Sequence, residues 1–237
     1  MLKVPGPGFT NKANKAGSMW EDVSWVQGII FDCDGVLIES QEANMRFYSL
    51  ILEKMGLPKL NEQDRFYVHM HTVHNSLGRI VPDSRLPEAL RIAREISYSQ
   101  VMDWVRPQPG LDHFLRLLQA GDILCAVNTN RTGTLSLVLE RFDLRQYFYP
   151  VISASDVTWP KPHPESVHLV LQSWRLSPED VVFIGDSDVD QQTAEAAGVT
   201  FWAYSNPQLE ADRHIDDFWS LHQNFRWQQP KCREVLI

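Results

Sequence analysis

The sequence contains few cysteines, and their spacing does not match that of a structural site. Among 237 residues there are three, Cys33, Cys125 and Cys232. An odd number without the close pair spacing of zinc ligands argues against a disulfide framework and against a zinc-binding module. We therefore expect free thiols and a cytoplasmic location.

Long apolar runs, a basic surplus and a nucleotide-binding loop are also missing. No stretch approaches the roughly 18 apolar residues of a membrane-spanning helix, so no membrane contact is expected. The formal net charge of -8 argues against general nucleic-acid binding, which needs a basic surface. The absence of GxxxxGK[ST] excludes a P-loop enzyme. Residues 1–22 lack the apolar core of a signal peptide and are expected to form a flexible N-terminal tail.

What the sequence does contain is an alternation of short apolar runs with amphipathic helical patterns. The runs are nearly continuous in apolar character, as in parallel strands buried on both faces, and they cover 26–31, 123–127, 150–153, 181–185 and 199–204. Between them, apolar residues recur at i, i+3, i+4 and i+7 in segments that begin at Leu111, Leu135 and Val167. Repeated strands and helices predict an α/β fold with a doubly wound parallel sheet.

One long segment interrupts this alternation and predicts a second structural unit. Residues 41–56 and 87–105 both have helical apolar spacing, which is more than one crossover helix needs. We therefore expect an inserted α-helical cap subdomain at 42–106. The remaining parts, 23–41 and 107–237, are expected to form one α/β core domain.

Polar residues follow four of the predicted strands. Ligands of open parallel sheets bind at the carboxyl ends of the strands, so these residues are expected to share one crevice. In chain order they are Asp32, Asp34 and Gly35, then Thr129 and Asn130, then Lys161, then Asp186, Asp188 and Asp190. Each one alone is typical of a turn, a helix cap or a solvated charge. Their common position after successive strands favours one catalytic site.

These motifs, in this order, resemble those of the haloacid dehalogenase superfamily. The similarity is greatest to its phosphoglycolate phosphatase and β-phosphoglucomutase-like members, which have a helical cap after the first strand. It runs from Val26 to about Phe218 and rests on DCDGV, on Thr129, on Lys161 in KPHPE and on GDSDVD. The resemblance implies a Rossmann-like core, a Mg²⁺ ion and phosphoryl transfer through an aspartyl-phosphate.

The two neighbouring aspartates receive different roles. Asp32 is expected to attack phosphorus, and Asp34 to act as the general acid and base. Asp32, Asp186 and the backbone carbonyl of Asp34 offer the oxygen ligands that Mg²⁺ prefers. An aspartate at position 34 argues against dehalogenase and phosphonate-cleaving activity, because relatives with those activities generally lack it. Cys33 is expected to face the core.

The later motifs are expected to bind the phosphate and to organise the charges around it. Thr129 and Asn130 are predicted phosphate ligands, and Lys161 is predicted to stabilise charge in the transition state. Asp190 would orient the metal-bound waters or hold Lys161, and Asp188 is expected to be structural.

Substrate specificity is expected to come from the cap. In HMHTVHNSLGR (69–79), Asn75 and Arg79 are candidates for contact with the leaving group. The histidines there do not line one helix face, which argues against a metal site. Arg131, after Thr129 and Asn130, could reach the substrate or lie at the surface, and the sequence leaves both open.

The expected function is that of a Mg²⁺-dependent phosphatase acting on a small phosphorylated metabolite, such as a sugar phosphate or phosphoglycolate. A phosphomutase of the β-phosphoglucomutase type uses the same residues and stays open as the alternative. A signalling receiver also has an acidic pocket with Thr and Lys, but it lacks the helical insert and the second acid. A non-catalytic binding protein is disfavoured by the complete residue set. A monomer and a homodimer both stay open.

Overall fold

A parallel six-stranded sheet forms the centre of the molecule. The computed structural model describes residues 23–225, apart from the side chains of Phe66, His69 and Met70, so the predicted tail at 1–22 lies outside the described residues. The strands are β1 (Gly28–Phe31), β4 (Leu124–Thr129), β5 (Val151–Ser153), β6 (Val181–Gly185), β7 (Thr200–Tyr204) and β8 (Arg213–Ile215). They lie in the order β5-β4-β1-β6-β7-β8, and all neighbours are parallel.

This strand order places a ligand crevice beside β1. The chain adds strands outward from β1 to β5 on one side and then from β6 to β8 on the other, which is the doubly wound arrangement. Phe31 at the end of β1 is in register with Val127 of β4 and Ile184 of β6. The loops after these three strands therefore begin within two residues of one level of the sheet, and the predicted Rossmann-like core is confirmed.

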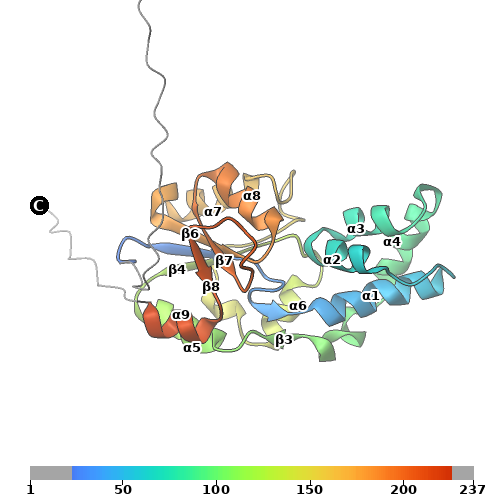
Figure 1. The fold of residues 1–237 in the computed structure, drawn as a ribbon, viewed down its shortest axis with the longest axis horizontal. Coiled ribbons are helices and arrows are strands. Elements are labelled where there is room, and N and C mark those ends of the chain that lie inside the picture. Colours follow the sequence, from blue (N-terminus) through green and yellow to red (C-terminus); the bar gives the residue numbers. More distant parts are fainter. Residues whose placement is uncertain (1–22, 226–237) are drawn as a thin grey trace, which may run out of the picture.

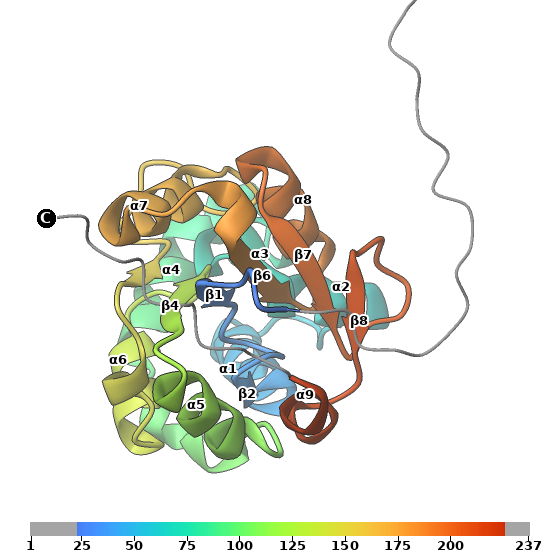
Figure 2. The ribbon, with the colours of Figure 1, turned by 90° about the vertical axis from the view of Figure 1, so that its left-hand side faces the viewer.

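Helices cover both faces of the sheet (Figure 2). On one face lie α5 (Leu111–Ala120), α6 (Leu135–Arg141) and α9 (Phe218–Asn224), and on the other lie α7 (Glu165–Trp174) and α8 (Asp188–Ala197). Neighbouring strand residues alternate between the faces: Ile29 and Phe31 pack with Phe114 of α5, whereas Ile30 packs with Val167 of α7. Each fully buried side chain of this size contributes about 1.5–3 kcal/mol. The nearly continuous apolar runs follow from burial on both faces.

Residues 40–105 form a separate helical segment beside the sheet (Figure 1). It contains α1 (Gln41–Lys54), α2 (Glu62–Met70), α3 (Val73–Ile80) and α4 (Leu86–Glu95), with the 3₁₀ turns η1 (Asp83–Arg85), η2 (Tyr98–Gln100) and η3 (Met102–Trp104). These helices pack around a hydrophobic cluster of their own, which includes Ile51, Leu77 and Ile92. The four helices therefore have a core of their own, whereas Tyr98 and Met102 of the same segment belong to the cluster that packs against the sheet.

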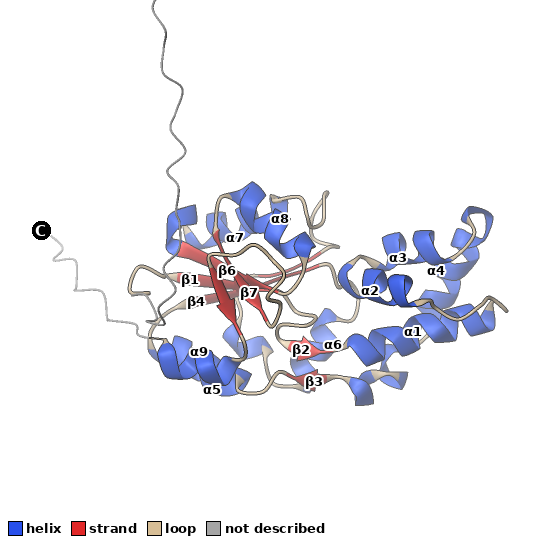
Figure 3. Cartoon of the chain, viewed as in Figure 1, coloured by secondary structure: helices blue, strands red, loops and turns tan. Residues whose placement is uncertain are grey.

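Two short strands join the helical segment to the sheet. β2 (Ile38–Glu39) leads into α1, and β3 (Arg106–Pro107) leads out of the segment. They pair antiparallel, with Ile38 opposite Pro107, and lie between the sheet and the helical segment (Figure 3). Both connections therefore run side by side.

The structure departs from the predicted elements in three places. The helix expected over 87–105 ends at Glu95, because Ile96 is extended (φ −77°, ψ 114°) and η2 and η3 follow it. Strand β8 and helix α9 were not predicted. Two further 3₁₀ turns, η4 (Arg145–Tyr147) and η5 (Pro178–Asp180), complete the described elements. Within residues 23–225, no helix is long and apolar enough to cross a membrane.

Candidate active site

Lys161 connects three of the predicted motifs. Its Nζ donates to Asp32 Oδ1 at 2.7 Å, to Asp190 Oδ1 at 2.5 Å and to the backbone carbonyl of Asn128 at 3.1 Å. Asp32 and Lys161 are only 6% and 7% exposed. Burial acts to lower the pKa of Lys161, but the carboxylates of Asp190 and Asp32 keep that pKa above its ordinary value. Lys161 is therefore a charged ammonium group at the end of β1.

The start of α8 fixes the orientation of Asp190. Ser187 Oγ accepts the Asp190 backbone N–H at 3.2 Å, and the Ser187 backbone N–H donates to Asp190 Oδ2 at 3.2 Å, which forms a capping box. Ser187 Oγ also donates to Asp190 Oδ2 at 2.6 Å. The other carboxylate oxygen of Asp190 bonds to Lys161. The N-terminus of α8 thus positions Asp190, and Asp190 in turn positions Lys161.

Asp32, Asp186 and Asp190 form an acidic cluster. One carboxylate oxygen from each lies within 4.8 Å of the others. Burial raises the pKa of Asp32 to about 7, with Lys161 opposing this and Asp190 and Asp34 adding to it. Burial and the carboxylates of Asp190 and Asp32 also raise the pKa of Asp186 well above its ordinary value. Three carboxylates around one ammonium are a set of hard oxygen donors with excess negative charge, and this fits a divalent cation such as Mg²⁺.

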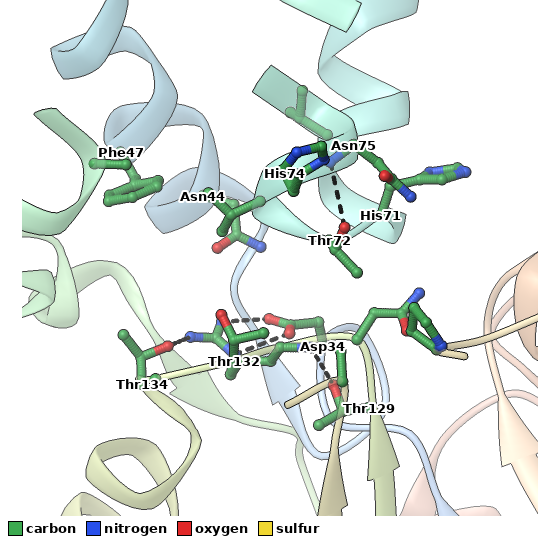
Figure 4. Close-up of a pocket in the computed structure, with 18 of the residues that line it drawn as sticks. Asp34, Asn44, Phe47, His71, Thr72, His74, Asn75, Thr129, Thr132 and Thr134 are labelled. Carbon is green, nitrogen blue, oxygen red and sulfur yellow. Dashed lines mark hydrogen bonds and ion pairs between the residues drawn. The ribbon is translucent and has the colours of Figure 1, made fainter. Parts of the chain in front are cut away.

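Asp34 belongs to a second ion pair at the same edge of the sheet. Its Oδ2 accepts from Arg131 Nε at 2.9 Å, its Oδ1 accepts from Arg131 Nη2 at 2.5 Å, and Ser40 Oγ also donates to it. Figure 4 shows Asp34 below the helical segment. The Arg131 side chain is only 5% exposed, so the structure selects the site position over the surface position.

The Arg131 guanidinium also connects to the helical segment. Nη1 donates to Thr134 Oγ1 and Nη2 donates to the hydroxyl of Tyr98, both at 2.9 Å. Tyr98 lies in η2, on the way out of the helical segment, and Ser40 stands at the start of α1. Residues from both connections between the layers therefore contact the Asp34–Arg131 pair.

The second motif lies between these two ion pairs. Thr129 is 2% exposed, and its Oγ1 accepts the backbone N–H of Arg131 at 3.0 Å. Asn130 Nδ2 donates to the carbonyl of Lys161 at 3.2 Å, whereas Asn130 Oδ1 and Asn128 Nδ2 are buried without a hydrogen-bond partner. Asn130 thus ties the loop of Lys161 to the end of β4, and its predicted contact with phosphate stays a prediction.

Cys33 faces away from the site, as expected. It is fully buried in the cluster that packs under α5, and burial raises the pKa of its thiol well above the ordinary value. Cys125 is also a free, buried thiol whose pKa burial raises to about 12. Neither thiol lines the cavity between the sheet and the helical segment.

A cavity of about 810 Å³ lies between the carboxyl edge of the sheet and the helical segment. The sheet side contributes Asp32, Asp34, Thr129, Asn130, Lys161 and Asp186 to its lining. The helical side contributes Asn44, Phe47, His71, Thr72, His74 and Asn75, which lie opposite Asp34 and Thr129 (Figure 4). The structure therefore brings Asn75 and the core motifs together around one space.

Arg79 is placed differently from the expectation. It is absent from the cavity lining, its Nε bonds to Asp64 at 2.9 Å, and its guanidinium lies 4.5 Å from the ring centre of Tyr67. The Tyr67 ring also stacks against the His71 ring, with ring centres 3.8 Å apart. The position does not support direct contact of Arg79 with a leaving group. Arg79 instead contacts Tyr67, which packs against His71 of the cavity lining.

Some contributors to the site could be recognised from sequence and others could not. Ser187 stands three residues before Asp190, which is the spacing of a capping box, so a local signal exists. Tyr98 and Ser40 contact the site through tertiary packing, and no motif in the sequence indicates this.

Comparisons with known proteins give the class. A family model described as haloacid dehalogenase-like hydrolase matches residues 29–204. The chain is 30% identical over 206 residues to the curated phosphoglycolate phosphatase of Escherichia coli O157:H7, covering 76% of this chain and 81% of that protein. The chain belongs to the haloacid dehalogenase-like hydrolase family, and the predicted membership is confirmed.

Solved structures agree. A HAD-superfamily hydrolase of subfamily IA, variant 1, from Geobacter sulfurreducens PCA has 37% identity and a TM-score of 0.74, covering 84% of this chain and 98% of that chain. CbbY from Rhodobacter sphaeroides, solved in complex with phosphate, has 20% identity and a TM-score of 0.71, covering 83% of this chain and 96% of that chain. At that identity the second similarity concerns the fold alone.

Proposed function

We propose that this hydrolase is a phosphatase that cleaves a small phosphorylated metabolite by transferring the phosphoryl group to Asp32. The main support is the position of Asp32, buried at the edge of the large cavity with Oδ1 held by Lys161. This contact orients the carboxylate and leaves Oδ2 for attack on phosphorus. The name of the relative in Escherichia coli makes 2-phosphoglycolate a natural first substrate to assay.

The reaction proceeds in two displacements. Asp32 Oδ2 bonds to phosphorus while the ester P–O bond breaks, and Asp34 gives a proton to the leaving oxygen. Asp34 then takes a proton from a water molecule, whose oxygen attacks the phosphorus of the aspartyl-phosphate. The bond to Asp32 breaks and inorganic phosphate leaves. Asp34 therefore has to carry a proton when the ester binds and regains one from the water, and Arg131 and Ser40 orient its side chain.

Charge neutralisation is the remaining requirement, because a phosphate dianion approaches several carboxylates. Asp32, Asp186 and the Asp34 backbone carbonyl are the proposed Mg²⁺ ligands, and the ion would offset negative charge on the phosphoryl oxygens. Lys161 adds a positive charge next to Asp32, and Thr129, which lines the cavity, is proposed to donate to a phosphoryl oxygen. Asp190 keeps Lys161 in place.

We also propose that residues 42–106 act as a cap on a core formed by 23–41 and 107–237. The support is the separate hydrophobic cluster of the helical segment and its place over the cavity. The cytoplasmic location and the oligomeric state stay predictions.

The test is Asp32→Asn, which keeps the shape of the side chain and removes the nucleophile. A panel of phosphorylated metabolites is assayed with Mg²⁺, following phosphate release and isomerisation together. We expect kcat/KM for phosphate release to fall at least about 10³-fold. Asp188→Asn is the control, because Asp188 is an exposed aspartate beside the same cluster and should keep activity. Near-normal turnover by the Asp32 variant would refute the mechanism, and faster isomerisation than phosphate release would identify a mutase.

A further inference from the structure

The cavity extends from the catalytic edge into the helical segment, where its walls become apolar. There it is lined by Phe47, Tyr48, Val68, Leu90, Ala93 and Ile96, which we call the apolar chamber. The residues come from α1, α2 and α4 and from the residue that ends α4. Asp34, on the core side of the same cavity, lies across from Phe47 (Figure 4).

The apolar chamber is a property of the helical segment alone. Tyr48, Val68 and Ile96 belong to the segment's own hydrophobic cluster, and Phe47, Leu90 and Ala93 pack against it. Helix α1 contacts α2 and α4, and α3 contacts the same two helices. The distances between these walls are therefore set by packing inside the segment, whatever its distance from the sheet.

The size and chemistry of this space do not match a two-carbon acid. The whole cavity, with the catalytic edge and the chamber together, has a volume of about 810 Å³, within the range of roughly 300–1,000 Å³ of pockets that hold larger organic ligands. A glycolate leaving group would fill a small part of it. His71, His74 and Arg94 also line the cavity, but a carboxylate placed against Phe47 and Leu90 would lose hydration without a compensating hydrogen bond, which is unfavourable. An apolar ring or branched chain would instead gain from contact with Phe47 and Leu90.

We propose that the leaving group of the natural phosphate ester carries an apolar face, such as an aromatic or alicyclic ring, and that this face binds in the apolar chamber. The phosphoryl group then lies at Asp32 and the ring between α1 and α4. That the ligand is a phosphate ester rests on the proposed phosphatase function. Binding in the apolar chamber can be tested without turnover.

The first experiment measures binding of two phosphonates, which are not hydrolysed. Isothermal titration calorimetry with Mg²⁺ compares phenylphosphonate with methylphosphonate. We expect phenylphosphonate to bind at least tenfold more tightly, because only its ring reaches the chamber. Equal affinities would overturn the proposal, whatever the protein hydrolyses.

A variant then locates the effect. Ala93→Phe should fill the chamber, remove the preference for phenylphosphonate and leave methylphosphonate binding within twofold of the parent protein. Arg91→Phe is the matched control, since Arg91 lies on the same helix, is exposed and is absent from the lining. If Ala93→Phe fails to fold, Phe47→Ala serves instead and should weaken phenylphosphonate at least threefold. A preference that survives the folded variant would overturn the assignment to this chamber.

Turnover separates this inference from the proposed function. We expect kcat/KM for phenyl phosphate to exceed that for 2-phosphoglycolate at least tenfold, with Ala93→Phe reducing only the former. The reverse order of the two substrates would overturn the inference and leave the phosphatase intact. Normal turnover by Asp32→Asn would instead refute the mechanism, while the phosphonate data would still decide the chamber.

Discussion

Gly35 brings the backbone close to the carboxylate of Asp186 in the acidic cluster. Its φ is +86°, and a Cβ added there would lie 2.0 Å from Asp186 Oδ2. Gly35→Ala must therefore displace the Asp186 carboxylate as well as strain the backbone. We predict a loss of at least about tenfold in kcat/KM, because misplacing groups by about 1 Å is costly to catalysis. Steady-state kinetics and urea unfolding measure the two effects separately.

Gly56→Ala provides the comparison for this prediction. Gly56 also has a positive φ, +65°, but an added Cβ there has no neighbour within 4 Å. This variant should lose stability by about 1–2 kcal/mol from backbone strain alone and keep its activity. If both variants kept activity equally, the contact between Gly35 and Asp186 would not matter for catalysis.

At the level of single residues, sequence order was informative where a motif follows a strand. Asp32, Lys161, Asp186 and Asp190 meet at one edge because parallel strands carry their loops there. The partner of Asp34 was harder to assign, because Arg131 lies 97 residues further along the chain. The sequence carries no periodic signal for the direction of a single side chain such as Arg131. Whether it lies in the site or at the surface therefore becomes clear only from the fold.

At the level of elements, the N-terminus of α8 links helix stability to the site. Ser187→Ala removes the cap and one of the hydrogen bonds that hold Asp190. We predict a loss of about 1 kcal/mol in the free energy of unfolding together with a fall in kcat, since Asp190 then holds Lys161 less firmly. Asp217→Ala removes the cap of α9, where Asp217 Oδ1 accepts from the Ser220 N–H at 2.7 Å. That control should lose similar stability at unchanged kcat, and a parallel fall in both variants would contradict the link.

Strands were predictable from the sequence where helices cover both faces of the sheet. The strands next to β1 have continuous apolar runs because helices cover both faces. β8 contains Arg213 and His214 at the edge of the sheet, so it shows no such run. The end of α4 was also missed, because Tyr98, Val101 and Met102 are buried in and between two 3₁₀ turns, with spacings close to those of a helix.

For the whole molecule, the acidic cluster makes folding stability depend on pH and on cations. Burial raises the pKa of Asp32 from 3.8 to about 7, so between these values the folded chain binds more protons than the unfolded chain. The stabilising contribution of this proton is therefore complete below about pH 4 and is lost as the pH rises through about 7. With a chelator present, the melting temperature should fall over this window. The fall should be smaller in Asp32→Asn, which has no proton to lose at this position.

Mg²⁺ should reverse this loss, because it stabilises the carboxylates in their ionised form. A ligand at 100 times its Kd stabilises the folded state by about 2.7 kcal/mol, which corresponds to roughly 5–10 °C for a chain of this size. We predict such a rise near pH 8 and a smaller one near pH 5, where protons compete with the ion for the cluster. Calorimetric melting with Mg²⁺ or with chelator measures both. Asp186→Asn should lose most of the rise, whereas Asp188→Asn, outside the cluster, should keep it. An equal rise in the parent protein and in Asp186→Asn would show that the ion binds elsewhere.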